Sequence, residues 1–331
     1  MTNPKTLQAF SPEEARIAQR LLATRVAFMM GRKFEEDDWA QVYCTAKGLE
    51  KRAWSNLDID VMSGSLGVEQ KMMCYSSKGD MSEACGTTMM HPSATRSIRV
   101  PGPETDAEEA MRDVLTQYGA LIAARSSKVK ELSGSDQEPD MRIGWLLWQD
   151  TLRQFLYFEQ EMLIPKPEEY TAQWVKRISK GSRKGSTNLW IFEKGGSGRK
   201  RYSVTSEAGA KIQPYFDIPP ITDKNVYLFT VIGEVLDTGL VRVWITEATH
   251  RELQRLLGDV NGAALSKAIM ESAAEAQAAG IEAETKMDVA VPLEVTLVAY
   301  QALQNAFQGV SDDHSFQLLA HHLRKAREAK Q

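Results

Sequence analysis

A chain of 331 residues with 43% hydrophobic and 25% charged residues is typical of a soluble globular protein with one large or two medium domains. No apolar run approaches the roughly 18 residues of a membrane helix, and the N-terminus lacks the pattern of a signal peptide, so we expect a cytoplasmic protein without membrane contact. A net charge of -4 gives no overall attraction to nucleic acid, and three irregularly spaced cysteines indicate neither a zinc site nor a disulfide framework.

Two helices are predicted near the start of the chain. Ser11, followed by Pro12 and by Glu14 three residues on, is a helix start, and apolar residues then recur at helical spacing up to Gly31. A second helix is predicted over residues 35–47, with four acids in its first turn. We interpret these acids as partners of the helix dipole and not as metal ligands.

A β-hairpin is predicted next, from two apolar-rich runs around a Ser-Gly-Ser turn within residues 57–75. Because residues two apart in a strand point to the same face, Asp58 and Asp60 share one face of the first strand. Glu69 and Lys71 share one face of the second strand in the same way. The hairpin therefore predicts that two or three acids and one lysine meet in space.

These residue types suit the cleavage of a phosphodiester bond. Carboxylate oxygens are the hard ligands that Mg2+ prefers, so Asp58, Asp60 and Glu69 are the candidate metal ligands. Lys71 beside them can orient or deprotonate an attacking water and offset the charge of a phosphate. The polar side of an ordinary surface hairpin is the alternative that the same residues allow.

The spacing also carries a resemblance. An aspartate, a gap of about ten residues and then Glu-x-Lys on the next strand resembles the PD-(D/E)XK nuclease superfamily, which includes most type II restriction endonucleases. The pattern here is Asp58 or Asp60, then Glu69 and Lys71, and the usual proline before the aspartate is absent. The resemblance covers about twenty residues and leaves the choice between the two aspartates open.

What the resemblance implies is an α/β (α+β) fold with a mixed central β-sheet flanked by helices of the restriction-endonuclease type. It also implies Mg2+-dependent hydrolysis of double-stranded DNA at specific sites, 5′-phosphate products and a homodimer in which each subunit cuts one strand. Catalysis would fall to Asp58 or Asp60, Glu69 and Lys71.

After the hairpin, residues 76–95 are predicted as a long polar loop. A short third strand is predicted over residues 97–100, with Arg96 and Arg99 available for phosphate. A helix is then predicted over residues 105–126, followed by a polar linker.

A rival motif lies further on. Pro139 and Asp140 form a PD dipeptide, and Glu159 and Glu161 follow 19 and 21 residues after Asp140. In some family members Glu-x-Glu replaces Glu-x-Lys. We rank this motif lower, because the apolar residues around it follow a helical period and predict a buried helix with its tryptophans in the core.

Residues 171–217 are predicted to form a β-rich module with a hairpin at Gly195 to Gly198. Between Lys176 and Lys211 there are ten basic and two acidic residues, a net charge of +8 over 36 residues that leaves -12 for the rest of the chain. A cationic strip on an acidic protein indicates a polyanionic partner.

The second arm of this hairpin predicts how DNA is contacted. Alternation places Arg199, Arg201, Ser203 and Thr205 on one side, with Lys200, Tyr202 and Val204 on the other. A two-stranded ribbon fits the major groove of DNA. The residues predicted to contact DNA are Arg96, Arg99, Lys180, Arg183, Lys184, Arg199, Lys200, Arg201 and Lys211.

Two more strands are predicted at residues 225–235 and 240–245, and the chain is predicted to be helical from Thr246 to its end. The predicted regions are thus a nuclease core (1–165), a basic DNA-contacting module (166–246) and a helical region suited to dimerisation (247–331). The function predicted is a Mg2+-dependent restriction endonuclease. A non-catalytic DNA-binding protein and a structure-selective repair or recombination nuclease are the alternatives.

Overall fold

The hairpin predicted around Gly64 is present in the computed structural model of the chain. Strand β2 (Val61–Ser63) pairs antiparallel with β3 (Leu66–Tyr75), with Val61 opposite Val68. Gly64 has a φ of +56°, in the left-handed region that a tight hairpin turn requires and that glycine adopts without strain. The turn therefore fixes the register of the strand that carries the Glu-x-Lys motif.

The structure describes residues 5–27, 34–49, 59–75, 81, 86–87, 98–134, 136–177, 186–195, 200–205, 211–272, 290–307 and 310–328. These residues form α-helices and three β-sheets, which confirms the predicted mixed α/β class. Among them, no helix combines the length and the apolar character needed to span a bilayer.

The chain divides into two compact units. Unit 1 consists of Met1–Ala9, Glu50–Leu147 and Leu156–Tyr227, and unit 2 of Phe10–Leu49, Trp148–Phe155 and Leu228–Gln331. Unit 1 thus combines most of the predicted nuclease core with most of the predicted basic module.

The main sheet has the strand order β1-β6-β5-β3-β2, and β11 pairs with β6. Its remaining strands are β1 (Thr6–Leu7), β5 (Asp140–Gln149), β6 (Gln154–Glu161) and β11 (Tyr227–Thr230). The buried helix predicted around the tryptophans was wrong, because these residues form β5 and β6. A strand buried on both faces has a continuous apolar sequence instead of an alternating one, which hides its period.

Helix α4 (Ala107–Ser133) connects β3 to β5 and contacts both the main sheet and a second sheet of unit 1. The Asp106 carboxylate accepts two backbone N–H bonds at its start, and Gly134, with a φ of +60°, ends it. The helix continues past the predicted end at Ser126 into the stretch interpreted as a linker. Its last turns are polar and mostly exposed, so they give little amphipathic signal.

Strands β3 and β5 run parallel. The Asp140 N–H donates to the Ser65 carbonyl at 2.8 Å, where both strands begin. Further along, a Cβ added to Gly144 would lie 2.5 Å from Gln70 Oε1, so the contacts advance in the same direction along both strands. A parallel pair joined through a helix is a βαβ unit. Strand β3 is thus held inside the sheet, between β2 and β5.

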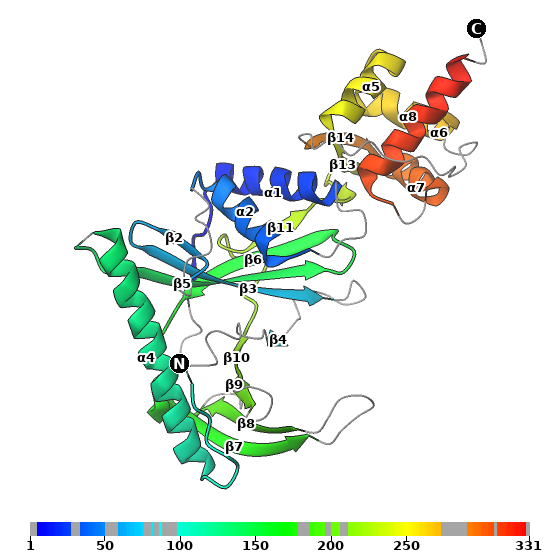
Figure 1. The fold of residues 1–331 in the computed structure, drawn as a ribbon. Helices are drawn as coiled ribbons and strands as arrows, with labels where there is room; N and C mark the ends of the chain where they lie inside the picture. The colour runs from blue at the N-terminus through cyan, green and yellow to red at the C-terminus, as the bar shows by residue number, and fades with distance from the viewer. Residues whose placement is uncertain are drawn as a thin grey trace. The chain divides into compact units, whose positions relative to one another are not determined.

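The second sheet of unit 1 has the order β4-β10-β9-β8-β7 (Figure 1). Its strands are β4 (Gly86–Thr87), β7 (Tyr170–Arg177), β8 (Ser186–Glu193), β9 (Lys200–Thr205) and β10 (Lys211–Phe216). A short 3-10 helix, η2 (Pro167–Glu169), directly precedes β7. This confirms the predicted β-rich module. One face packs on α4, where Leu189, Ile191 and Val204 join Met111 and Leu115 in a common core.

Unit 2 contains the first two helices and the C-terminal part of the chain. The predicted helices at the start are α1 (Pro12–Ala27) and α2 (Glu36–Ala46), and the Ser11 and Glu14 pair forms the predicted capping box. The acids of the first turn of α2 cap that helix, since Glu35 and Asp38 form a second capping box.

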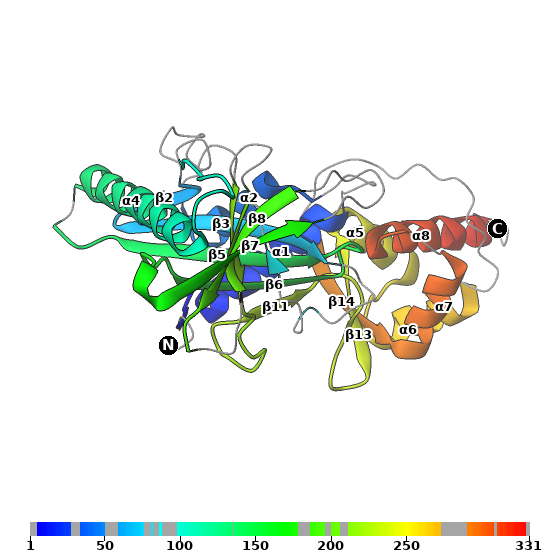
Figure 2. The ribbon, with the colours of Figure 1, turned by 90° about the horizontal axis from the view of Figure 1, so that it is seen from below.

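The rest of unit 2 is a three-stranded sheet covered by helices (Figure 2). Its elements are β12 (Glu234–Val235), β13 (Leu240–Thr246), α5 (Glu247–Leu257), α6 (Gly262–Ser272), β14 (Ala290–Thr296), α7 (Leu297–Ala306) and α8 (Asp312–Glu328). The prediction of helix throughout this region was wrong at β14. Pro292 starts one of the predicted helices, but proline is also accepted in an edge strand, and here β14 pairs with β13 along its whole length.

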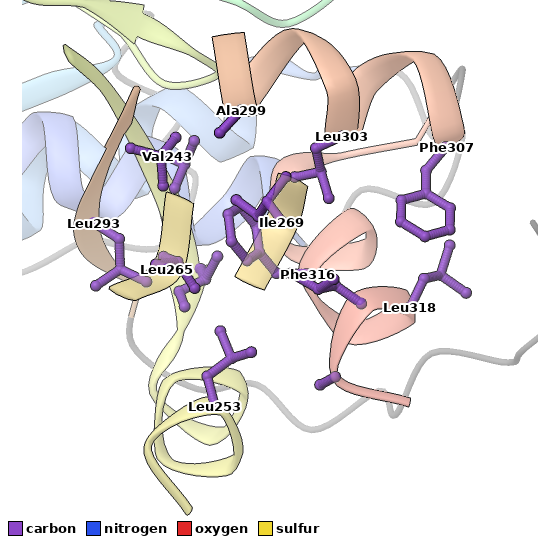
Figure 3. Packing of buried hydrophobic residues seen from close by; sticks show 14 of the residues in the cluster. Val243, Leu253, Leu265, Ile269, Leu293, Ala299, Leu303, Phe307, Phe316 and Leu318 are labelled. Carbon is purple, nitrogen blue, oxygen red and sulfur yellow. The ribbon is translucent and has the colours of Figure 1, made fainter. Parts of the chain in front are cut away.

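An apolar core holds these elements together (Figure 3). Val243 and Leu293 reach it from the sheet, and Leu253, Ile269 and Phe316 reach it from three of the helices. All but Leu293 among these side chains have no measurable exposure, so the core is closed to water.

Candidate active site

The centre of the predicted motif is a buried ion pair on β3. Glu69 and Lys71 are only 5% and 7% exposed, although both carry a full charge in water. Lys71 Nζ donates to Glu69 Oε1 at 2.6 Å. Charged side chains are buried at this level only when they are paired, because desolvation of a lone charge costs several kcal/mol. The pair therefore belongs to the interior and is not the polar side of a surface hairpin.

Helix α4 adds two side chains that the sequence pattern did not indicate. Arg125 Nη1 lies 3.8 Å from Glu69 Oε2, and its side chain is 11% exposed. Burial raises the pKa of the Tyr118 hydroxyl to about 12, and the negative charge of Glu69 adds to this effect. Tyr118 and Arg125 are seven residues apart and so lie on one face of α4. An arginine on the apolar face of a predicted helix is the signal that could have identified this position.

Glu69 thus lies between two cations, one on its own strand and one on the helix that covers the strand. Its second oxygen, Oε2, is buried and has no hydrogen-bond partner among the residues that the structure describes. Buried carboxylate oxygens are nearly always satisfied, so such an atom calls for an explanation. A ligand that supplies positive charge at Oε2 would provide one.

The two candidate aspartates differ in what the structure says of them. Asp58 lies outside the described residues. Asp60 is exposed, and its Oδ2 accepts the backbone N–H of Gln70 at 2.6 Å. Asp60 directly precedes β2, and this hydrogen bond holds its carboxylate against the strand that carries Glu69 and Lys71. Asp60 is therefore the described aspartate that accompanies the buried pair.

A second polar network, on the other face of the main sheet, contains the rival motif. The Tyr157 hydroxyl donates to Glu159 Oε1 at 2.8 Å, and Arg142 Nη1 donates to Glu159 Oε2 at 3.0 Å. Arg142 also forms an ion pair with Asp140. The hydrogen bond between these two side chains is the main cause of the raised pKa of Arg142. Two acids of the rival motif, Asp140 and Glu159, are therefore brought together with an arginine between them, whereas the third, Glu161, is exposed.

Gly144 makes this network possible, because a Cβ there would lie 2.4 Å from the Tyr157 hydroxyl. We expect Gly144→Ala to lower the free energy of unfolding by about 1–3 kcal/mol, since the network must shift to admit a methyl group. Urea denaturation followed by circular dichroism measures the change. Gly119→Ala is the control: among the described residues its Cβ meets only a methyl group of the exposed Ile164, and alanine favours the helix. Equal stability of the two variants would contradict the prediction.

Most of the predicted DNA contacts cannot be placed. Arg96, Lys180, Arg183, Lys184, Arg199 and the side chain of Lys211 lie outside the described residues. Arg99 is exposed, and its backbone N–H and carbonyl are both bonded to the Gln117 side chain. Residues 98–100 form no strand, which corrects the prediction for that segment. The side chain of Arg99 extends from a loop that is anchored on α4.

The predicted alternation along β9 was wrong because of a β-bulge. The pairing of β8 with β9 shifts between Ile191 and Phe192, so Lys200 lies opposite Phe192 while Tyr202 lies opposite Ile191. Lys200 and Tyr202 therefore point to opposite faces of the sheet. Arg201 forms ion pairs with Glu193 at 3.3 Å and Asp217 at 2.9 Å, so acids inside unit 1 compensate its charge.

Within the described residues, no three acidic, histidine or cysteine side chains form a group that could hold a metal ion. Comparison of the chain with protein-family models, with curated proteins and with solved structures finds no match.

Proposed function

We propose that the protein is a Mg2+-dependent DNA endonuclease. Asp60, Glu69 and Lys71 would form the centre that hydrolyses the phosphodiester bond, with Asp58 as a further candidate metal ligand. The observation that carries this proposal is the buried Glu69–Lys71 pair, whose carboxylate keeps one oxygen without a hydrogen-bond partner among the described residues. Structural ion pairs normally satisfy both oxygens. A carboxylate that binds a further ligand would instead have one oxygen without a hydrogen bond from the protein.

The residues fit a magnesium ion in their chemistry. Glu69 Oε2 is a hard oxygen that accepts no hydrogen bond from the described residues, and Asp60 supplies a second carboxylate, which accepts the N–H of the adjacent Gln70. When bound, Mg2+ would stabilise negative charge on the phosphate and on the leaving oxygen. Arg125, at 3.8 Å from the same oxygen, adds a second positive charge beside the carboxylate but is too far away to form a hydrogen bond with it.

The protein's own residues would orient the reactants. The bond from Lys71 Nζ to Glu69 Oε1 fixes the direction of the ammonium group, which has two more N–H donors. Lys71 can thus hold an attacking water or a phosphate oxygen in line for displacement. The hydrogen bond from the Gln70 N–H holds the Asp60 carboxylate against β3 in the same way.

The restriction-endonuclease fold type, site-specific cleavage of double-stranded DNA, action as a homodimer and a cytoplasmic location are part of the same proposal. The βαβ arrangement of β3, α4 and β5 around the pair supports the fold type, and the net charge of +8 between Lys176 and Lys211 supports contact with DNA. Site specificity and the homodimer are carried by the resemblance alone, and the cytoplasmic location by the sequence alone.

An assay on plasmid DNA tests the proposal. Purified protein is incubated with supercoiled plasmid and Mg2+, with and without EDTA, and we expect discrete linear bands that EDTA abolishes. A smear or selective cutting of branched DNA would assign the structure-selective alternative. Binding of DNA without cleavage under Mg2+ or Mn2+ would overturn the enzymatic proposal and assign the non-catalytic alternative.

A further inference from the structure

The second sheet of unit 1 has one face that does not pack on α4. Along β8, Leu189 and Ile191 enter the core with α4, so the alternating residues Trp190 and Phe192 point to the other face. Their rings meet edge to face, with centroids 6.4 Å apart. Both side chains are partly exposed. Large rings on the face away from a core need a reason other than the packing of that core.

The β-bulge of β9 brings a lysine to this aromatic face. Lys200 Nζ lies 4.0 Å from the centre of the Trp190 ring and 4.3 Å from the centre of the Tyr215 ring. The ammonium group is thus held between two rings by cation–π attraction. Without the shift in register at Phe192, Lys200 would lie on the same side as Tyr202, in the core.

The row of residues across the sheet at Trp190 is polar. Trp190 lies opposite Gln173 of β7 and Ser203 of β9, and Ser203 lies opposite Gln213 of β10. Gln173 is exposed and Gln213 is partly exposed. The face therefore combines flat apolar rings, amide groups that can both donate and accept hydrogen bonds, and a positive charge.

We propose that this face, defined by Trp190, Phe192, Lys200 and Tyr215, binds the unpaired bases of single-stranded nucleic acid. Aromatic rings on a sheet stack on base faces, and these faces are accessible only when the bases are not stacked in a duplex. The net charge of +8 between Lys176 and Lys211 attracts the phosphate backbone to the same segment. The amide groups of the row can bond to base edges.

The inference goes beyond the proposed function and concerns binding. It rests on that function only where it concerns cleavage: the sheet would hold an unpaired segment next to the duplex, while the Glu69–Lys71 centre acts on the duplex backbone. Charge complementarity favours nucleic acid over an apolar protein partner, because Lys200 and the glutamine row would be desolvated without compensation in an apolar interface.

Fluorescence anisotropy in EDTA, which suppresses cleavage, tests the binding step. The probes are a labelled 20-nucleotide single strand and the duplex of the same sequence, at one fixed salt concentration. We expect the single strand to bind more tightly. We expect Trp190→Ala to weaken that binding about 5- to 150-fold, the range for the loss of one stacked base, and to leave duplex binding within twofold.

Two further variants keep the test decisive. Lys200→Ala removes the charge from the aromatic face, and Lys194→Ala removes the same charge from an exposed position of the same segment. Lys200→Ala is expected to weaken binding of the single strand more than Lys194→Ala. If Trp190→Ala does not fold, as judged by circular dichroism, Tyr215→Leu takes its place with the same expectation.

The inference is overturned if the folded aromatic variants bind the single strand as the unmodified protein does, or if Lys194→Ala has the same effect as Lys200→Ala. The proposed function fails separately. Tight binding of single strands without any cleavage in Mg2+ would overturn the proposed nuclease activity but not the proposed binding face. Cleavage of plasmid by a protein that binds single strands no more tightly than the duplex would overturn the binding face but not the nuclease activity.

Discussion

Lys71→Met alone is expected to lower the free energy of unfolding by about 3–5 kcal/mol and to abolish DNA cleavage. The substitution leaves the Glu69 carboxylate 5% exposed and without the ammonium group that bonds it at 2.6 Å. Breaking a buried ion pair from one side has a cost in this range because an uncompensated charge stays in the interior. The 3.8 Å contact with Arg125 compensates only in part, since it is too long for a hydrogen bond. Chemical denaturation measures the change.

The double variant Glu69→Gln with Lys71→Met separates stability from catalysis. It removes both charges and keeps side chains of nearly the original volume, and replacing a buried ion pair by neutral groups is often neutral or stabilising. We therefore expect most of the stability lost in Lys71→Met to return in the double variant. Cleavage is expected to stay absent, because the metal ligand and the lysine are both gone. Return of cleavage together with stability would show that the pair is structural.

An exposed ion pair of similar length is the matched control. Lys128 and Glu131 on α4 approach to 2.9 Å, but their side chains are 44% and 67% exposed. Lys128→Met is expected to change the free energy of unfolding by less than about 1 kcal/mol, as for most surface pairs. A similar loss of stability in Lys128→Met and Lys71→Met would mean that burial does not govern the effect.

The sequence was sufficient for elements whose local signals agree. Ser11 and Glu14 predict the start of α1, and the Ser-Gly-Ser turn predicts the β2–β3 hairpin, because capping and turn chemistry are read from neighbouring residues. Strands β5 and β6 were missed for a physical reason. Both are covered on two faces, and an apolar run of this kind has no period of two that would distinguish it from a buried helix.

The candidate site shows the same division. Glu69 and Lys71 were predicted as neighbours because they are two apart in a strand, and the structure bonds them to each other. Arg125 and Tyr118 were missed because they reach the pair from a helix some fifty residues away, a contact that only the β3-α4-β5 crossover creates. The position of Lys200 was missed because a β-bulge inverts the alternation that the sequence shows.

A second large effect is expected on the pH dependence of the free energy of unfolding, through the carboxyl group of Asp312 in unit 2. Asp312, at the start of α8, is 2% exposed and accepts hydrogen bonds from the Gly233 N–H and from the Tyr300 hydroxyl, both at 3.0 Å. Burial raises the pKa of this carboxyl from 3.8 to about 6, against the opposing effects of these hydrogen bonds and of Arg153. At about 1.4 kcal/mol per pKa unit, this difference corresponds to about 3 kcal/mol.

The direction follows from where the proton binds more tightly. Between pH 4 and pH 6 the folded state holds a proton on Asp312 that the unfolded state has released, so the contribution of this group to stability falls as the pH rises through that window. Above about pH 6 the carboxyl is charged in both states, and the loss is complete. Asp312→Asn removes the titration. We therefore expect the free energy of unfolding of Asp312→Asn, relative to that of the unmodified protein, to rise by up to about 3 kcal/mol between pH 3.5 and pH 7.

Tyr300→Phe is the informative partner in this measurement. The substitution keeps the carboxyl and removes a hydrogen bond that lowers its pKa, so the pKa should rise further and the loss of stability should extend to higher pH. The two variants are thus expected to change the pH profile in opposite directions, although both alter the same contact. Denaturation midpoints at four or five pH values decide the matter. Parallel profiles for all three proteins would mean that the pKa of Asp312 is the same in the folded and unfolded states, and that the Gly233 N–H, the Tyr300 hydroxyl and Arg153 together offset its burial.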